Sequence, residues 1–204
     1  MTTIKLHDVL WRAKNAGASP DGNRRTELYF AGCQKAMSGN PCKNCFNPRL
    51  WDNTHHLPHE AAEIADTLDR HEIPRYITIV GGEPTDQLDG LRELIPLLHR
   101  HGYEMIMFTW HNADWVMEHV GCDVLARLSY TICGPYDETR RIYDTTKDDG
   151  IHNAIGSDNQ TLLFCKEDGS HSEIPVYKVD RIEYRFGRPY LVGPDGTEVS
   201  VWNR

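Results

Sequence analysis

The stretch CQKAMSGNPCKNC, residues 33–45, places three thiols within thirteen residues, and the rest of the chain is best interpreted from it outward. Two residues separate Cys42 from Cys45, a gap that lets both sulfurs point at one metal centre. The apolar run LYFAG at 28–32 leads into this segment like a strand. Three thiolates are fewer than the four ligands of a closed zinc site or of a cubane iron–sulfur cluster. Either a fourth protein ligand comes from elsewhere, or one metal position is open to a substrate.

Composition narrows the class of protein. The 204 residues are 39% hydrophobic and 25% charged, which is ordinary for one globular domain. The chain has no run of about 18 apolar residues, so no membrane span is expected. The start, MTTIKLH, lacks the apolar segment of a signal peptide, so we expect a cytoplasmic location, where six cysteines indicate metal binding or reduced thiols. A net charge of −8 argues against non-specific binding of nucleic acid.

Strand-like and helix-like segments alternate along most of the chain. A lead-in strand and a loop are expected in residues 1–25. The apolar patterns then predict strands at 28–31, 76–80, 105–109, 128–133 and 161–165, and helices at 58–71, 88–101 and 113–120. Residues 33–51 are predicted to be a loop, and Pro96 is expected to kink its helix or to start a second one. Alternation at this spacing favours parallel strands with right-handed crossovers. Five or six such units are too few for a closed eight-fold barrel, so we expect an α/β fold with a partial, open βα barrel.

The character of the sequence changes after Lys166. Short strands are predicted at 174–178, 182–185, 190–192 and 199–202, with turn signals at 187–189 and 194–196. We therefore predict two parts, a partial barrel at 1–166 and a small antiparallel β appendage at 167–204.

Three segments resemble the cluster region of the radical S-adenosylmethionine (radical SAM) superfamily, and most closely its glycyl-radical-enzyme activases. They are DGNRR at 21–25, FAGC at 30–33 and CKNCFNPRLWD at 42–52. The resemblance implies that Cys33, Cys42 and Cys45 are the metal ligands and the catalytic residues, each binding one iron of a [4Fe-4S] cluster. The amino and carboxylate groups of S-adenosylmethionine would bind the fourth iron. The sequence departs from the family in its eight-residue spacer, residues 34–41, where three residues are usual, and in Asn44, where an aromatic residue is common. We expect the longer spacer to bulge outward.

Two further motifs support the resemblance. In ITIVGGEP, residues 77–84, glycines at a strand end let a ligand approach the backbone, and Glu83 offers an acceptor to an ammonium group. The motif is similar to the family's Gly-Gly-Glu-Pro segment, which implies that Gly81, Gly82 and Glu83 hold the methionine amino group. On its own the tetrapeptide also fits an ordinary strand-to-helix turn. Thr109, at the end of the next strand, is expected to reach the cofactor's ribose or carboxylate, the alternative being a hydroxyl that satisfies the backbone.

A last pair of segments, CGPYD at 133–137 and IGSDNQ at 155–160, resembles the activase of anaerobic ribonucleotide reductase. It implies adenosine contacts from Gly156, Ser157 and Asn159, although a Gly/Asn turn without a ligand has the same pattern. The implied partner is a glycyl radical enzyme, expected to be anaerobic ribonucleotide reductase, with an external electron donor such as a flavodoxin and with no nucleic acid or membrane. Two alternatives stay open. One is a radical SAM enzyme acting on a small molecule, similar to 7-carboxy-7-deazaguanine synthase. The other is a zinc-stabilised binding module with a fourth Cys or His ligand.

Overall fold

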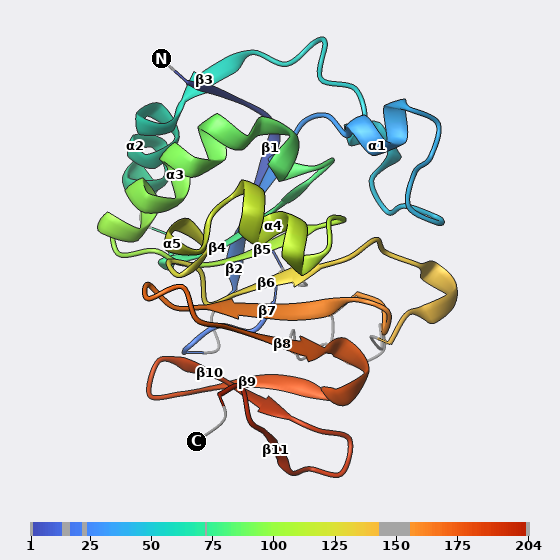
Figure 1. The fold of residues 1–204 in the computed structure, drawn as a ribbon. Coiled ribbons are helices and arrows are strands. Elements are labelled where there is room, and N and C mark those ends of the chain that lie inside the picture. Colours follow the sequence, from blue (N-terminus) through green and yellow to red (C-terminus); the bar gives the residue numbers. More distant parts are fainter. Residues whose placement is uncertain (1, 14–16, 22–23, 72, 143–155, 203–204) are drawn as a thin grey trace.

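One mixed sheet of eight strands dominates the computed structural model, which describes residues 2–13, 17–21, 24–71, 73–142 and 156–202. Gly22, Asn23 and Ile155, which belong to the motifs quoted above, lie outside these residues. The strand order is β3-β1-β2-β4-β5-β6-β7-β8 (Figure 1). The strands are β1 (Thr3–Ala13), β2 (Arg25–Phe30), β3 (Pro58–Glu60), β4 (Tyr76–Gly81), β5 (Glu104–Thr109), β6 (Tyr130–Cys133), β7 (Thr161–Cys165) and β8 (His171–Pro175). The predicted α/β class is confirmed.

The four central strands β2, β4, β5 and β6 run parallel, because helical segments return the chain to the same edge of the sheet. These helices are α2 (Ala61–Arg70), α3 (Leu88–Arg100), α4 (Ala113–His119) and α5 (Cys122–Leu125). Three residues that were predicted to begin the first of them, 58–60, form β3 instead, and α3 is one helix that contains Pro96. In the part of the chain described here, no helix is long and apolar enough to cross a membrane.

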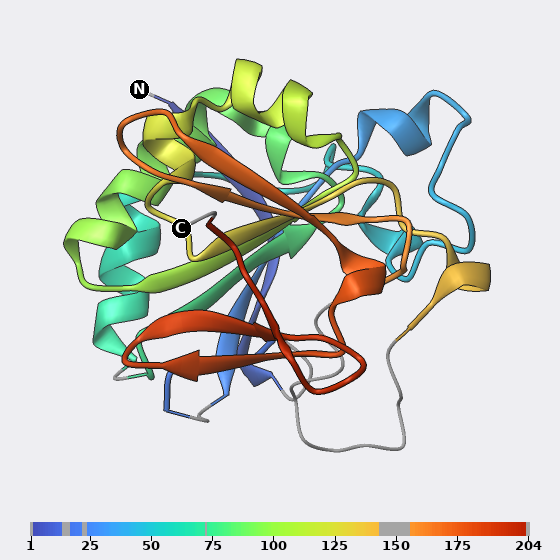
Figure 2. The same ribbon diagram turned by 60° about the horizontal axis from the view of Figure 1, so that its bottom comes forward.

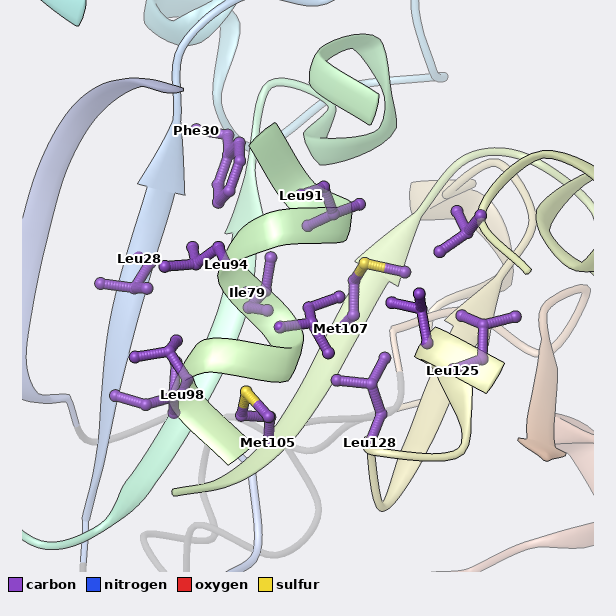
Figure 3. Close-up of a cluster of buried hydrophobic side chains, with 14 of the residues drawn as sticks. Leu28, Phe30, Ile79, Leu91, Leu94, Leu98, Met105, Met107, Leu125 and Leu128 are labelled. Carbon is purple, nitrogen blue, oxygen red and sulfur yellow. The ribbon is translucent and has the colours of Figure 1, made fainter. Parts of the chain in front are cut away.

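One face of the central sheet is apolar throughout, and the other is apolar over β5 and β6, so these two strands have nearly continuous hydrophobic sequences. On one face Leu28, Ile79 and Met107 pack against Leu91 and Leu94 of α3 (Figure 3). On the other face a second core joins Ile106, Tyr130 and Phe164 to the C-terminal sheet. β5 and β6 are therefore buried on both sides, whereas Glu27 and Tyr29 of β2 and Val80 of β4 line a pocket.

The second core is closed by a separate antiparallel sheet of β9 (Arg181–Arg185), β10 (Arg188–Val192) and β11 (Glu198–Val199) (Figures 1 and 2). Its inner residues, Ile182 and Leu191, are buried in that core. The small C-terminal antiparallel sheet predicted from the turn signals is thus confirmed. The expected boundary at 166 falls in the turn between β7 and β8, and β8 belongs to the main sheet.

The strand at 161–165 differs from the prediction. It was expected to continue the βα series, but β7 runs antiparallel to β6 and pairs with β8 as a hairpin. The turn at 166–170 is too short for a crossover, so the hairpin has to be antiparallel. The regular parallel part of the sheet therefore ends at β6.

Candidate functional site

A pocket of about 740 Å³ opens where the parallel strands end. The cysteine loop follows the carboxyl end of β2, the Gly-Gly-Glu turn lies at the end of β4, and Thr109 is the last residue of β5. The fold therefore brings these distant segments to one edge of the sheet. Crevices at this edge are where open α/β sheets bind ligands. The pocket is lined by Leu10, Trp11, Arg12, Ala13, Glu27, Tyr29, Cys33, Ala36, Cys42, Cys45, Phe46, Asn47, Trp51, Val80, Gly81, Gly82, Glu83, Phe108, Thr109, Trp110, Gly134, Tyr136, Gly156 and Gln160.

The loop that carries the cysteines is fixed at its base. Gly32 N–H donates to the Leu50 carbonyl at 2.7 Å, and Cys33 N–H donates to the Trp51 carbonyl at 2.9 Å. The two ends of the loop are thus held side by side like a short pair of strands. All three predicted ligands, Cys33, Cys42 and Cys45, are brought to the same pocket by this closure.

The turn between Cys42 and Cys45 depends on Asn44, whose φ of 51° lies in the left-handed region. Asn tolerates this conformation better than most side chains, which gives a backbone reason for Asn at this position. Cys45 N–H donates to the Cys42 carbonyl at 3.2 Å and closes the turn. Lys43 links the turn to the segment after β6, since its Nζ donates to the Thr139 hydroxyl at 3.0 Å.

Burial disfavours the thiolate form of two of these cysteines, because it raises the pKa of Cys33 to about 11 and also raises the pKa of Cys42. Metal binding would have to displace their protons. Backbone N–H groups already interact with the sulfurs, and such interactions tune iron–sulfur centres. The neighbours are Ala36 at Cys33, Tyr136 at Cys42, and Asn47 at Cys45 with N···S 3.4 Å.

This arrangement fits a cluster better than a single ion. Within the described ranges, no three His, Cys, Asp or Glu side chains converge as the ligands of one metal ion do. In a cubane each thiolate binds a different iron atom, so the ligands surround the cluster instead of meeting at one point. The lining as described above also contains no histidine and no fourth cysteine. Among the described lining residues, Cys33, Cys42 and Cys45 are thus the side chains of these two types.

The spacer at 34–41, predicted as part of a loop, contains the short helix α1 (Gln34–Met37). Gln34 N–H donates to Asp86 Oδ2 at 2.6 Å, which ties the start of α1 to the turn after Glu83. Gly39, with a φ of 85°, ends the helical turn. The segment projects from the body of the molecule (Figure 1), as expected for an outward bulge, and its Ala36 belongs to the pocket lining.

Gly81 and Gly82 line the pocket, but the structure gives them a reason that the sequence did not. A Cβ at Gly81 would lie 2.3 Å from the backbone of Phe30, and one at Gly82 would lie 2.0 Å from the Gly32 carbonyl. The two glycines therefore let the turn after β4 press against the start of the cysteine loop. Glu83 N–H then donates to the Gly32 carbonyl at 2.7 Å. Their contact with a ligand stays a prediction.

Glu83 is 1% exposed and nevertheless lines the pocket. Its Oε1 accepts bonds from the Thr85 hydroxyl and N–H at 2.7 and 2.9 Å, and its Oε2 accepts one from Trp110 N–H at 2.9 Å. Burial raises the pKa of Glu83 to about 7 in spite of these donors. A carboxylate whose charge is disfavoured by burial gains most from a cationic ligand, and Oε2 has a free lone pair for one. The residue thus fits the binding of an ammonium group.

The Thr109 hydroxyl forms its hydrogen bonds within the protein. It donates to Glu83 Oε1 at 2.9 Å and accepts from His111 N–H at 3.1 Å. Because its only proton is given to Glu83, Thr109 orients that carboxylate, and direct contact with a cofactor stays a prediction. Trp110, next in the chain, has its indole Nε1 buried without a hydrogen-bond partner among the described residues.

The segment at 156–160 forms a turn that is bonded to the end of β6. Gln160 Nε2 donates to the Gly134 carbonyl at 2.8 Å, and Asn159 Nδ2 donates to the Pro135 carbonyl at 2.7 Å. Gly156 lines the pocket, whereas Ser157 is fully buried and bonded to Gln160 Oε1 through its N–H at 3.0 Å. Of the three residues predicted here, only Gly156 belongs to the described lining, and the predicted adenosine contacts of all three stay untested.

Sequence reasoning missed several lining residues. Gln160 was quoted in its motif but was not chosen, although a buried amide that bridges two turns is visible only in three dimensions. Tyr136 packs against Phe46 as a tilted ring pair, with ring centroids 4.4 Å apart, which no local pattern indicates. Glu27 and Tyr29 occupy alternate positions of β2, where a polar alternation within an apolar strand was the available signal.

Comparison with known proteins gives the family. A model of the 4Fe-4S single cluster domain family matches residues 20–163, more than half of the chain, and the match spans the cysteine loop and the Gly-Gly-Glu turn. The chain belongs to this family and is an iron–sulfur protein with a [4Fe-4S] cluster as its cofactor. A search of curated proteins gave no match.

Proposed function

We propose that the protein is a radical SAM enzyme, and that it generates a glycyl radical on a partner enzyme, anaerobic ribonucleotide reductase. The observation that carries this proposal is one pocket that holds three cysteine thiols, a buried acceptor for an ammonium group at Glu83, and no fourth cysteine or histidine in its described lining. The amino and carboxylate groups of S-adenosylmethionine would complete that ligand set.

The fold supports the proposal. The parallel strands β2, β4, β5 and β6 end at the pocket, with helices on one face and the C-terminal sheet on the other. We infer that they form the partial barrel of the radical SAM type, and that β7 and β8 extend its wall as a hairpin.

When bound, a reduced [4Fe-4S] cluster supplies one electron that breaks the sulfonium carbon–sulfur bond of S-adenosylmethionine, giving methionine and a 5′-deoxyadenosyl radical that takes a hydrogen atom from the substrate. In this chain Cys33, Cys42 and Cys45 would hold the irons. Glu83, oriented by Thr109, would bind the ammonium group. The walls of the pocket would keep water from the radical. An external one-electron donor, such as a flavodoxin, must supply the electron.

A protein substrate suits the open side of the pocket. Phe46 and Leu10 belong to its lining and are still 53% and 46% exposed, so its rim is apolar and accessible. Exposed apolar groups around a cavity are typical of contact surfaces. A glycine-bearing loop of the partner could enter between them.

The second candidate is a radical SAM enzyme that acts on a small molecule, similar to 7-carboxy-7-deazaguanine synthase. The observation that favours it is the lengthened spacer at 34–41 with its extra helix α1, because that family tolerates longer cysteine loops.

Anaerobic reconstitution with iron and sulfide, followed by reduction in the presence of S-adenosylmethionine, tests the proposal. We expect the wild type to form 5′-deoxyadenosine and methionine in a one-to-one ratio. Cys122→Ala, which removes a thiol outside the pocket lining, is the control and should give the same yield as the wild type. Cys42→Ala should reduce the yield to background. No 5′-deoxyadenosine from the wild type would refute the proposal, and colourless protein with one bound zinc would instead support the binding module.

Electron paramagnetic resonance then distinguishes the glycyl-radical activase from the enzyme that acts on a small molecule. Incubation with the reductase encoded in the same genome should give a glycyl radical signal. If S-adenosylmethionine is cleaved without that signal, and a purine analogue stimulates the cleavage, the enzyme that acts on a small molecule is favoured.

A further inference from the structure

A second carboxylate lies in the pocket, on β2, apart from the residues assigned to cofactor binding. Glu27 is 9% exposed and belongs to the pocket lining together with Tyr29. The two side chains are on the same face of β2, because they are two residues apart. β2 pairs with β4 in register, with Glu27 opposite Thr78 and Tyr29 opposite Val80. Glu27 therefore lies about 10 Å along the strand from Phe30, on the side away from the cysteine loop that follows β2.

The carboxylate of Glu27 is only half satisfied. Tyr29 donates its hydroxyl to Glu27 Oε2 at 2.8 Å. Oε1 accepts no bond from a described residue, and it is not among the polar atoms sealed from solvent. Arg12 is the cationic residue of the described lining, but burial and the Tyr29 hydroxyl, not Arg12, are what act on the Glu27 carboxyl. A buried carboxylate without a charged partner is costly, and such a group in a cavity is a candidate for ligand binding.

The chemistry of the surroundings limits the ligand. An ionised carboxylate accepts hydrogen bonds and donates none, so it selects an N–H or O–H donor. Around it the walls are apolar, with Leu10, Val80 and Phe108 in the lining. A peptide backbone meets both conditions, since its N–H is a donor and its remaining surface at a glycine is small and apolar.

We propose that Glu27, held by Tyr29, binds the backbone N–H of the substrate glycine and so positions its α-carbon in the pocket. This proposal rests on the proposed function, because it gives the partner's glycine-bearing segment a docking point. The carboxylate fixes the peptide plane that adjoins the reacting carbon, while Glu83 at the edge of the sheet serves the cofactor. Glu27 and Tyr29 are thus residues for substrate binding and specificity.

The test uses reconstituted holoprotein with S-adenosylmethionine and three synthetic peptides. The first is an N-acetylated nonapeptide with the sequence of the reductase's glycine-bearing loop. In the second, sarcosine replaces the glycine and removes its N–H. A third peptide, with N-methylation at the preceding residue, controls for the added methyl group. Dissociation constants are measured anaerobically by fluorescence anisotropy.

We expect the wild type to bind the glycine peptide about 10- to 100-fold more tightly than the sarcosine peptide, as for a hydrogen bond to a charged group. Glu27→Leu should lose this preference, Glu27→Gln should keep part of it because an acceptor oxygen remains, and Tyr29→Phe should weaken it. Glu167→Leu, a control carboxylate in the turn after β7, should behave as the wild type.

Equal binding of the glycine and sarcosine peptides by the wild type would overturn the proposal, and this arm does not depend on any variant folding. Unchanged binding of the glycine peptide by Glu27→Leu, or no binding of it by the wild type, would overturn it too. Formation of 5′-deoxyadenosine without peptide is measured in parallel. If that activity is present in all variants while the peptide preference is absent, this proposal fails and the cofactor chemistry stands. If the activity is absent from the wild type, the proposed function fails as well.

Discussion

Asn44 shows how one residue sets the geometry of the cysteine turn. Its φ of 51° is unfavourable for most side chains and harmless for glycine. Asn44→Gly should therefore leave the stability of the protein nearly unchanged, whereas the β-branched Asn44→Val should cost about 1–2 kcal/mol and loosen the spacing of Cys42 and Cys45. Urea unfolding measures the first effect, and iron content after reconstitution measures the second. Equal iron content in both variants would show that the turn does not depend on this conformation.

Glu83 should make the stability of the cluster-free protein depend on pH. Its pKa is raised from 4.5 to about 7 in the folded state. The folded protein then holds a proton that the unfolded chain releases, so this contribution is complete below about pH 4.5 and is lost as the pH rises through 7. Glu83→Gln cannot titrate. The difference in unfolding free energy, wild type minus variant, should fall between pH 5 and pH 8 in urea titrations. The substitution itself can change the unfolding free energy by an amount that does not depend on pH. A difference that stays the same from pH 5 to pH 8 would contradict the raised pKa.

At the scale of elements, Asp69 links α2 to the segments that lead into β4 and β5. It accepts bonds from His101 at 2.7 Å and from the Tyr103 hydroxyl at 2.9 Å, and it pairs with Arg75. These donors, with His101 foremost, lower the pKa of Asp69 to about 2. The contribution is present above pH 3.8 and is lost as the pH falls through about 2.

Asp69→Asn should therefore lower the unfolding free energy of the cluster-free protein at pH 7 by about 1 kcal/mol, a modest value because the group is partly exposed. The gap to the wild type should close as the pH falls from 4 to 2 in chemical denaturation. Asp89→Asn, on the exposed surface of α3, is the matched control and should change little. A gap that persists at pH 2 would assign the loss to packing instead of charge.

At the scale of the whole molecule, the sequence predicted the elements better than their directions. Buried strands and amphipathic helices follow from local hydrophobic periodicity, so β4, β5 and α3 were predicted nearly to the residue. The antiparallel course of β7 was not predicted, because a short apolar run carries no information on which neighbour it pairs with. The residues of the site likewise differ in how far the sequence predicted them. Its cysteines stand in a motif, whereas Glu27 is one acidic residue in a strand and becomes notable only when the fold places it in a cavity.

The C-terminal sheet is the part of the molecule whose role a stability measurement can decide. It supplies Ile182 and Leu191 to the core that covers Ile106 and Tyr130 of the main sheet. Because these contacts bury the second face of β5 and β6, the C-terminal sheet should unfold together with these strands and not as an independent unit.

Leu191→Ala should therefore lower the unfolding free energy by about 2–5 kcal/mol, the usual cost of removing a large side chain from a packed core. Phe186→Ala, in the turn between β9 and β10, is the matched control, since that side chain is fully exposed and should contribute within about 0.5 kcal/mol. Urea unfolding followed by both tryptophan fluorescence and circular dichroism should give one coincident transition for each variant. Two separate transitions, with only the first shifted by Leu191→Ala, would instead make residues after β8 a domain of their own.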